Sequence, residues 1–207
     1  NLNNHNDNDT YHIFIKGWRR ALPFFTDNKD VSIKGDFNAY HKIIITASET
    51  QNALEELNKT INNLDDNETK VFVSEYVHNN PESAIAPYLT YKYKWAFNLS
   101  ELKELKNIIK QNNNSGYYGK LTEYIKLLER TDVGQKYMDF TLDNVDGKPV
   151  TLSSIINNNK LIMIDFWASW CPDCRVENPN VVSVYNKFKD KGLEIVSVSL
   201  DTDKDAW

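Results

Sequence analysis

Cysteine is scarce in this sequence of 207 residues, which contains only Cys171 and Cys174. A structural zinc site would need two ligands in addition to such a pair. The four histidines are scattered without ligand spacing, at His5, His12, His41 and His78. The absence of further ligands argues against zinc, and we predict no metal site and no cofactor.

Long apolar runs and basic blocks are also missing. No apolar stretch approaches the roughly 18 residues that a membrane span needs, so we predict no membrane span in this chain. The net charge is −5, and basic residues are not interleaved with aromatic ones. These two features argue against nucleic-acid binding. The apolar and charged fractions, 41% and 26%, are ordinary for a globular protein.

The two cysteines lie between an apolar run and a helical pattern. Residues 161–167 are rich in branched and aromatic side chains, which predicts a buried strand. After Cys171, apolar residues recur at helical spacing, at Val181, Tyr185 and Phe188. We therefore expect Cys171 to start a helix, with Pro172 at the first helical position.

A cysteine at a helix start is chemically activated. The helix N-terminus has roughly half a positive charge and free N–H donors. Both favour a thiolate, and they lower a cysteine pKa from about 8.5 to roughly 3.5–7.5. Cys174 follows one turn later, close enough to form a disulfide. The spacing predicts Cys171 as an exposed nucleophile and Cys174 as its resolving partner, while an inert disulfide or an incidental pair stays open.

The sequence around the cysteines resembles a known family. Residues 166–175, FWASWCPDCR, are similar to the active-site segment of thioredoxin-fold proteins. The flanking sequence is similar to the TlpA/ResA-type thiol-disulfide oxidoreductases of the bacterial envelope. Residues 133–142 and 146–152, VGQKYMDFTL and DGKPVTL, resemble the lead-in of that family. Downstream, Glu177 and Pro179 fit its Cys-x-x-Cys-x-x-Glu-x-Pro pattern.

The resemblance covers about residues 133–207, so we predict an α/β thioredoxin-like domain over residues 132–207. Residues 137–160 fit a β-hairpin around Asp146-Gly147, followed by a short turn of helix. Residues 193–200 form a second predicted buried strand after the active-site helix. Strand, helix and strand then make a βαβ unit with a parallel pair and a right-handed crossover.

A complete domain of this family continues with another helix and an antiparallel hairpin, and a cis-proline loop lies against its cysteines. No proline follows Pro179 in this sequence. Without that helix and hairpin, the domain would have an unpaired sheet edge and exposed apolar surface. We therefore expect the thioredoxin-like fold to be incomplete at its C-terminus and the natural protein to be longer. The first residue is Asn1 rather than Met, which is compatible with removal of an export signal.

An α+β region is predicted before the thioredoxin-like domain. Residues 1–47 are expected to form a small β-rich N-terminal unit. Its strands make a small antiparallel β unit and are predicted at residues 11–15, 31–34 and 42–46.

Residues 48–131 are predicted to form a helical region, because apolar residues recur at helical spacing along them. We expect these apolar stripes to pack as a core. Two helix starts are indicated by the capping-box pattern, Ser48 with Gln51 and Asn98 with Glu101.

The motif implies a thiol-disulfide oxidoreductase with a Cys-Pro-Asp-Cys dithiol. The Cys171 thiolate would attack a disulfide of a partner protein, and Cys174 would resolve the mixed disulfide. Asp173 opposes ionisation of the thiolate, which makes a weaker oxidant and favours a reductase. Arg175 partly offsets the charge of Asp173, so the opposite direction, disulfide formation, stays open.

The expected partners are disulfide-containing or dithiol proteins and an upstream thiol-disulfide electron donor. The resemblance implies a periplasmic or cell-envelope location, and it makes apocytochrome thiols one candidate substrate.

Two carboxylates and two flanking side chains complete the predicted site. Asp165 lies inside the apolar run and resembles the buried aspartate of thioredoxin, which accepts a proton from the resolving cysteine. Glu177 shares a helix face with Cys174 and resembles the active-site glutamate of the ResA-type branch. We hypothesise that either carboxylate accepts the proton of Cys174, and the alternatives are a solvated strand end and a surface charge. Trp170 and Pro172 are expected to border the docking surface.

Two other functions stay open. A peroxiredoxin-like thiol peroxidase would share the lead-in, but its usual Pro-x-x-x-Thr-x-x-Cys pattern does not precede Cys171. In a non-catalytic module, residues 1–130 would bind a partner and the thioredoxin-like part would serve as a scaffold. The intact Cys-x-x-Cys unit argues against that interpretation, whereas the expected incompleteness of the thioredoxin-like fold favours it.

Overall fold

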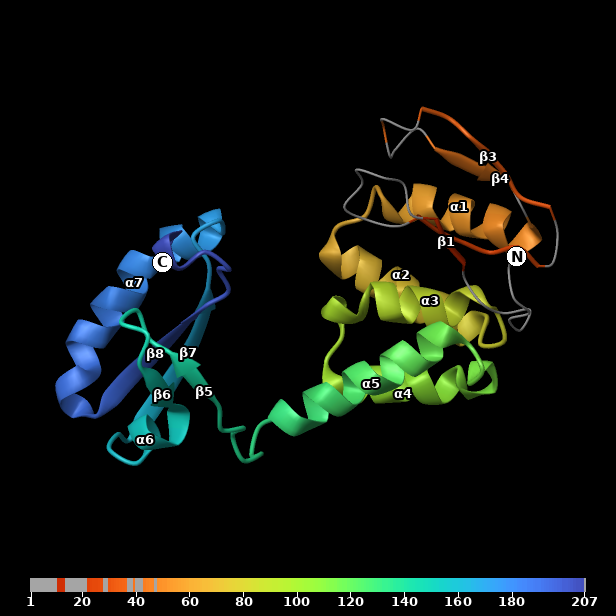
Figure 1. The fold of residues 1–207 in the computed structure, drawn as a ribbon. Coiled ribbons are helices and arrows are strands. Elements are labelled where there is room, and N and C mark those ends of the chain that lie inside the picture. The colour runs from red at the N-terminus through yellow and green to blue at the C-terminus, as the bar shows by residue number, and fades with distance from the viewer. Residues whose placement is uncertain are drawn as a thin grey trace. The chain divides into compact units, whose positions relative to one another are not determined.

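The computed structural model of the chain describes residues 11–13, 22–27, 30–36, 39, 43–46 and 48–206. These residues form two compact units, 1–135 and 136–207 (Figure 1). The first unit is mainly helical, and the second contains a parallel strand pair and a hairpin. The division of the first unit into domains 1–47 and 48–131 stays a prediction.

Two short antiparallel strand pairs belong to the first unit. They are β1 (Tyr11–Ile13) with β2 (Leu22–Phe24), and β3 (Ser32–Lys34) with β4 (Ile44–Thr46). The antiparallel pairing is as predicted, but it makes two separate two-stranded sheets. Sequence patterns do not indicate β2, because Pro23 is at the centre of its three residues and proline disfavours strands. Residues 14, 15 and 42 of the predicted strands lie outside the described residues.

The helices of the first unit are α1 (Glu49–Ile61), α2 (Asp66–Asn79), α3 (Ile85–Lys92), α4 (Leu99–Ile108) and α5 (Gly116–Thr131). Short 3₁₀ turns, η2 (Lys94–Ala96) and η3 (Lys110–Asn112), separate α3 from α4 and α4 from α5. α5 packs against α3 and α4, and α2 also contacts both of them. Their predicted apolar stripes form the buried core, which includes Leu54, Val73, Leu89, Leu102 and Leu121.

Complete capping boxes fix where two of these helices begin. Asn98 and Glu101 form the predicted capping box of α4, with hydrogen bonds of 3.0 Å and 2.9 Å. Asp65 and Glu68 form a second capping box at α2, from the same sequence pattern. None of the described helices, in either unit, combines the length and the hydropathy of a membrane span.

Gln51 joins the N-terminal strands to α1. Only half of the predicted capping box forms here, because Ser48 Oγ accepts from Gln51 N at 3.0 Å while the Gln51 side chain bonds elsewhere. Its Oε1 accepts a hydrogen bond from Phe25 N at 3.0 Å, and Ser48 Oγ donates to Phe25 O at 3.2 Å. All three residues are buried, and Phe25 belongs to the core of the helices. The chain after β2 is therefore anchored to α1.

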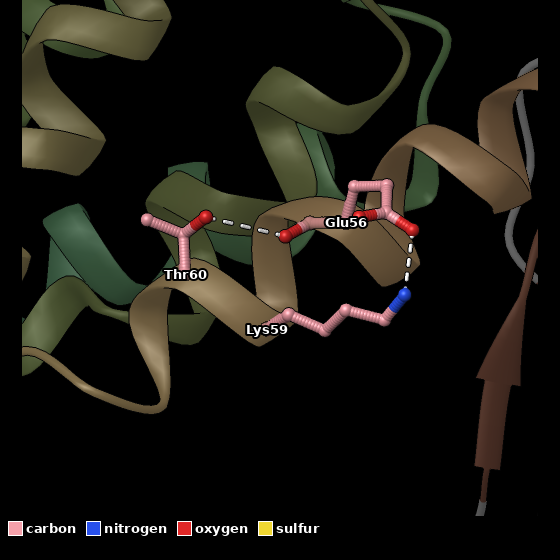
Figure 2. Close-up of polar contacts among 3 residues, drawn as sticks. All are labelled: Glu56, Lys59 and Thr60. Atoms are coloured by element: carbon pink, nitrogen blue, oxygen red, sulfur yellow. Dashed lines mark hydrogen bonds and ion pairs between the residues drawn. The ribbon is translucent and has the colours of Figure 1, made fainter.

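The outer face of α1 is polar. Lys59 Nζ lies 2.6 Å from Glu56 Oε1, and Thr60 Oγ1 donates to Glu56 O at 3.4 Å. Figure 2 shows both contacts as dashed lines. The hydrogen bond to Glu56 raises the pKa of Lys59. Both charged side chains are exposed, so water and salt screen the pair and it contributes little to stability.

The second unit begins with a hairpin and continues as a βαβ unit. Its elements are β5 (Thr141–Asp143), β6 (Pro149–Thr151), α6 (Leu152–Ile156), β7 (Leu161–Trp167), α7 (Pro172–Phe188), η4 (Lys189–Lys191), β8 (Leu193–Ser199) and η5 (Lys204–Ala206). β5 and β6 are antiparallel, with Gly147 at φ 72° in the turn, as predicted. β7 and β8 are parallel from Leu161↔Leu193 to Trp167↔Ser199. This pairing confirms the predicted βαβ unit.

The predicted burial of strand 161–167 is wrong. Leu161, its first residue, and Phe166, its last but one, are 64% and 61% exposed. In the described part of the chain, β7 pairs with β8 alone, so no second strand covers its other edge. The predicted buried strand 193–200 is correct only at its start, because Leu193 is buried and the rest of β8 is partly or fully exposed. The apolar runs thus indicate strands without indicating their burial.

We expect the substitution Gln51→Met to lower the free energy of unfolding by about 1–3 kcal/mol, since the buried Phe25 N–H would lose its acceptor. Methionine is close to glutamine in volume, so little packing should change. Urea denaturation followed by the helical circular dichroism signal measures the effect. Asn52→Met, at the exposed next position of α1, is the matched control. Equal stabilities of the two variants would show that the Gln51–Phe25 bond does not anchor the strands.

Candidate active site

Cys171 and Cys174 are joined by a disulfide at the start of α7, with 5.3 Å between their Cα atoms. Cys171 is the N-cap residue, and Pro172 occupies the first turn, as predicted. Cys171 Sγ accepts a hydrogen bond from Cys174 N at 3.2 Å. Both cysteine residues are partly exposed.

The position of Cys171 determines its electrostatic surroundings. α7 is 17 residues long, and the N–H groups of its first turn have no partner within the helix. The Cys174 N–H already points at Cys171 Sγ in the disulfide form. When the disulfide opens, the same N–H and the positive end of the helix would stabilise a thiolate on Cys171.

Trp170 and Pro172 border a groove beside the disulfide. The groove is also lined by Ser169, Arg175 and Val176. Trp170 is 69% exposed, and Pro172 is exposed as well. The lining is mostly apolar with one cationic side chain, which suits contact with a polypeptide.

Asp165 is less buried than predicted. It lies near the end of β7, opposite Ser197 of β8, and Ser197 Oγ donates to Asp165 Oδ2 at 3.3 Å. Its carboxylate is partly exposed, since β7 is poorly covered in the described part of the chain. The sequence pattern indicates burial because Asp165 lies within an apolar run, but that run is itself largely exposed.

Glu177 lies one turn after Cys174 on α7, and it is exposed. Its Oε2 accepts a hydrogen bond from Asn180 Nδ2 at 3.0 Å. Among the hydrogen bonds of residues 136–206, none connects Glu177 or Asp165 to a cysteine. The structure therefore places both carboxylates in the cysteine-containing unit without a hydrogen bond to either cysteine, and their roles stay predictions.

Asp201, two residues after the end of β8, is missed by sequence reasoning. Its Oδ2 accepts from Ser169 N at 2.9 Å, and its Oδ1 accepts from Ser169 Oγ at 2.7 Å. Ser199 Oγ donates to Oδ2 at 2.7 Å. The hydrogen bonds from Ser169, followed by the one from Ser199, lower the pKa of Asp201 below its ordinary value of 3.8. The sequence did contain an indication of Asp201. Two parallel strands end at the same edge of a sheet, so polar residues that follow them are candidates for a site at that edge.

Metal binding has no support in the described residues. Within them, no three histidine, cysteine, aspartate or glutamate side chains are grouped so that they could hold a metal ion.

The C-terminal part of the chain is similar to known proteins. Residues 133–206 match the AhpC/TSA family. The thiol-disulfide oxidoreductase ResA of Oceanobacillus iheyensis is 42% identical over 73 residues, which are 33% of this chain and 37% of that protein. ResA of Bacillus subtilis is 33% identical over 76 residues, covering 37% of this chain and 41% of that protein. The chain thus spans less than half the length of these curated relatives.

Solved structures of oxidoreductases are also similar in sequence. The crystal structure of the thioredoxin domain of a thiol-disulfide oxidoreductase from Bacteroides vulgatus is 33% identical, covering 37% of this chain and 53% of that one, with a TM-score of 0.34. The solution structure of a thiol:disulfide interchange protein from Bacteroides sp. is 36% identical, covering 34% and 45%, with a TM-score of 0.31.

The family match and the curated relatives confirm the predicted resemblance to ResA-type thiol-disulfide oxidoreductases. Together with the βαβ unit, they also confirm an α/β thioredoxin-like fold for the C-terminal part of the chain.

The lowered pKa of Asp201 predicts a pH-dependent contribution to stability. Because the folded-state pKa is below the unfolded one, the stabilisation is complete above the ordinary pKa of 3.8 and is lost as the pH falls through the folded value. We expect wild type to melt at a higher temperature than Asp201→Asn at pH 6, and this difference to shrink between pH 4 and pH 2. Thermal unfolding across this range measures it, with Asp203→Asn as control. A difference that stays constant in acid would contradict the prediction.

Proposed function

We propose that this chain is a thiol-disulfide oxidoreductase that reduces disulfides in partner proteins through Cys171 and Cys174. The main support is the partly exposed disulfide at the N-terminus of α7, next to an exposed tryptophan and an apolar groove. The 42% identity to a ResA protein over 73 residues supports the same chemistry. This similarity to ResA also favours a thiol-disulfide oxidoreductase over a thiol peroxidase.

The reaction would start from the dithiol form. The Cys171 thiolate attacks one sulfur of the partner disulfide, so a Cys171–partner bond forms and the other partner sulfur leaves as a thiolate. Cys174 then loses its proton and attacks Cys171 Sγ. This step forms the Cys171–Cys174 disulfide and releases the partner as a dithiol. The partner gains two electrons and two protons in total, and an upstream thiol-disulfide donor returns them to this chain.

The geometry supports separate roles for the two cysteines. Cys171 is the N-cap residue, next to the exposed Trp170 and Pro172, where a partner can approach. Cys174 lies within the first turn, and its backbone N–H contacts Cys171 Sγ. We assign the attack to Cys171 and the resolution to Cys174 for this reason. Trp170 and Pro172 would contact the polypeptide on either side of the partner disulfide.

Asp165 and Glu177 are proposed as alternative proton acceptors for Cys174. Glu177 is one helical turn away and exposed, whereas Asp165 lies on β7 and is partly exposed. Neither is hydrogen-bonded to a cysteine in the described disulfide form, so a water molecule would relay the proton.

The direction of electron flow follows from the residues between the cysteines. Asp173 is in the first turn of α7, where its negative charge competes with the thiolate for the helix N-terminus. A less stabilised thiolate makes the disulfide harder to reduce and the dithiol a better donor. We therefore propose a reductase, located in the periplasm or cell envelope as the resemblance implies. Its partners would be disulfide-containing or dithiol proteins, and one candidate substrate is the disulfide that apocytochrome thiols form on oxidation.

The test of this function is the reduction of a protein disulfide by the dithiol form of the chain. We expect Cys171→Ser to abolish reduction, because the attacking sulfur is lost. Cys174→Ser should keep the first step and accumulate a mixed disulfide, which mass spectrometry detects. Glutathione or dithiothreitol titration should give a reduction potential near or below roughly −250 mV.

Two results would contradict the proposal in different ways. A reduction potential near roughly −120 mV would identify an oxidant that installs disulfides. A Cys171–Cys174 disulfide that cannot be reduced and reformed would leave only a non-catalytic partner-binding module.

We expect the double variant Asp165→Asn/Glu177→Gln to slow the resolution of the mixed disulfide by about tenfold. General bases typically contribute more, roughly 100-fold and above, but water can partly replace a solvent-accessible carboxylate. Stopped-flow release of a fluorescent partner peptide from the mixed disulfide measures this rate. Asp190→Asn/Glu194→Gln, at the far end of the βαβ unit, removes the same charges as a control. An unchanged resolution rate in the first double variant would exclude both carboxylates as proton acceptors.

A further inference from the structure

We infer that Asp201 is a positioning residue for Cys171, because it fixes the loop between β7 and α7 through Ser169. This inference rests on the proposed function of the cysteines and adds to it a third carboxylate with a different task. Asp201 would not exchange protons with the reacting sulfur atoms. It would hold Cys171, the residue at the start of α7, in position.

The loop between β7 and Cys171 is short and has two internal restraints. Ala168 is only 1% exposed, and its carbonyl oxygen accepts from Cys171 N at 3.1 Å. Ser169 lies between these two residues, and both its backbone N–H and its hydroxyl donate to Asp201. A side chain two residues after the end of β8 thus holds the middle of the turn that leads into Cys171. Trp170, the residue between Ser169 and Cys171, is 69% exposed, so packing against the protein does little to hold this part of the loop.

Asp201 is itself held in place. Ser199 Oγ donates to Asp201 Oδ2 at 2.7 Å, and Asp201 N donates to Ser199 Oγ at 3.1 Å. The adjacent Leu200 N donates to Trp167 O at 2.9 Å, which joins the ends of β8 and β7. The carboxylate is therefore a fixed acceptor on the sheet, and a reactive group needs such supporting contacts to keep its geometry.

Positioning and charge have opposite effects on Cys171. If Asp201 keeps the N-cap in place, its loss should weaken the contact between the helix N-terminus and the thiolate, and Cys171 should ionise at a higher pH. If Asp201 acts only as a nearby negative charge, its loss should make ionisation easier and shift it to a lower pH. The carboxylate is partly exposed, so salt screens its charge, and we expect positioning to dominate.

Two substitutions separate these effects. Asp201→Ala removes both the acceptor and the charge. Asp201→Asn removes the charge alone, because its amide oxygen can accept from Ser169 N and its amide group can donate to the Ser169 hydroxyl. Both are made in the full chain with Cys174→Ser, so that Cys171 is the only thiol. Thiolate absorbance against pH in 0.15 M salt gives the midpoint of Cys171 ionisation.

We expect Asp201→Ala to raise this midpoint by about 0.5 pH unit, which is the typical size of a helix N-terminus effect on an anion. Asp201→Asn should restore most of the wild-type midpoint. Asp203→Ala, at an exposed carboxylate two residues later, is the control and should leave it unchanged. Near-ultraviolet circular dichroism confirms that the variants are folded. If Asp201→Ala does not fold, Ser169→Ala replaces it, with a smaller rise expected because one donor remains.

An unchanged midpoint in Asp201→Ala, or in Ser169→Ala where that variant replaces it, would overturn the inference. Equal midpoints for Asp201→Ala and Asp201→Asn would also overturn it, because asparagine keeps the hydrogen-bonding groups that alanine lacks. A fall in both midpoints would overturn it as well, since loss of the charge alone would then explain the effect. Failure of the proposed function is a separate result, because it would appear as a wild-type disulfide that cannot be reduced and reformed. A wild-type chain that reduces protein disulfides, with an unchanged Asp201→Ala midpoint, would overturn this inference alone.

Discussion

The parallel pairing of β7 with β8 is the constraint on which the candidate site depends. A parallel pair needs a crossover, and here the crossover is α7. The carboxyl ends of both strands therefore lie at the same edge, where α7 begins. This arrangement brings Cys171, from the end of the first strand, and Asp201, from the end of the second, into one hydrogen-bonded neighbourhood. The chemistry of the cysteines and the support for their loop both follow from this one topological feature.

In both units, hydrogen bonds from polar side chains attach a segment without regular secondary structure to the start of a helix or to the residues just before it. In the first unit, Gln51 and Ser48 at the start of α1 bond the backbone of Phe25. In the second unit, Asp201 bonds the backbone and side chain of Ser169 just before α7. In each case a polar side chain satisfies a backbone group that no sheet or helix satisfies. The first bond is buried and fixes a strand, whereas the second is partly exposed and lies next to the reactive residue.

Local sequence patterns predict the elements well and their surroundings poorly. The Cys-x-x-Cys unit, the hairpin at Gly147 and the βαβ order all follow from spacing and turn residues, and the structure contains each of them. The burial of β7 does not follow, because burial depends on how many strands and helices cover it. The role of Gln51 as an anchor and the contact of Asp201 with Ser169 depend on pairings between distant segments. Those pairings have no periodic signal in the sequence.

The disulfide between Cys171 and Cys174 has a consequence for the thermodynamics of the chain. It closes a ring across a sequence separation of only three, so it removes little conformational entropy from the unfolded chain. The difference in stability between the disulfide and dithiol forms then depends mainly on groups that act on the sulfur atoms in the folded chain, such as the helix N-terminus and Asp173. The same groups set the affinity of the site for electrons, so the reduction potential and this difference in stability are linked. A change that stabilises the folded dithiol relative to the disulfide makes the site a stronger oxidant by the same free energy.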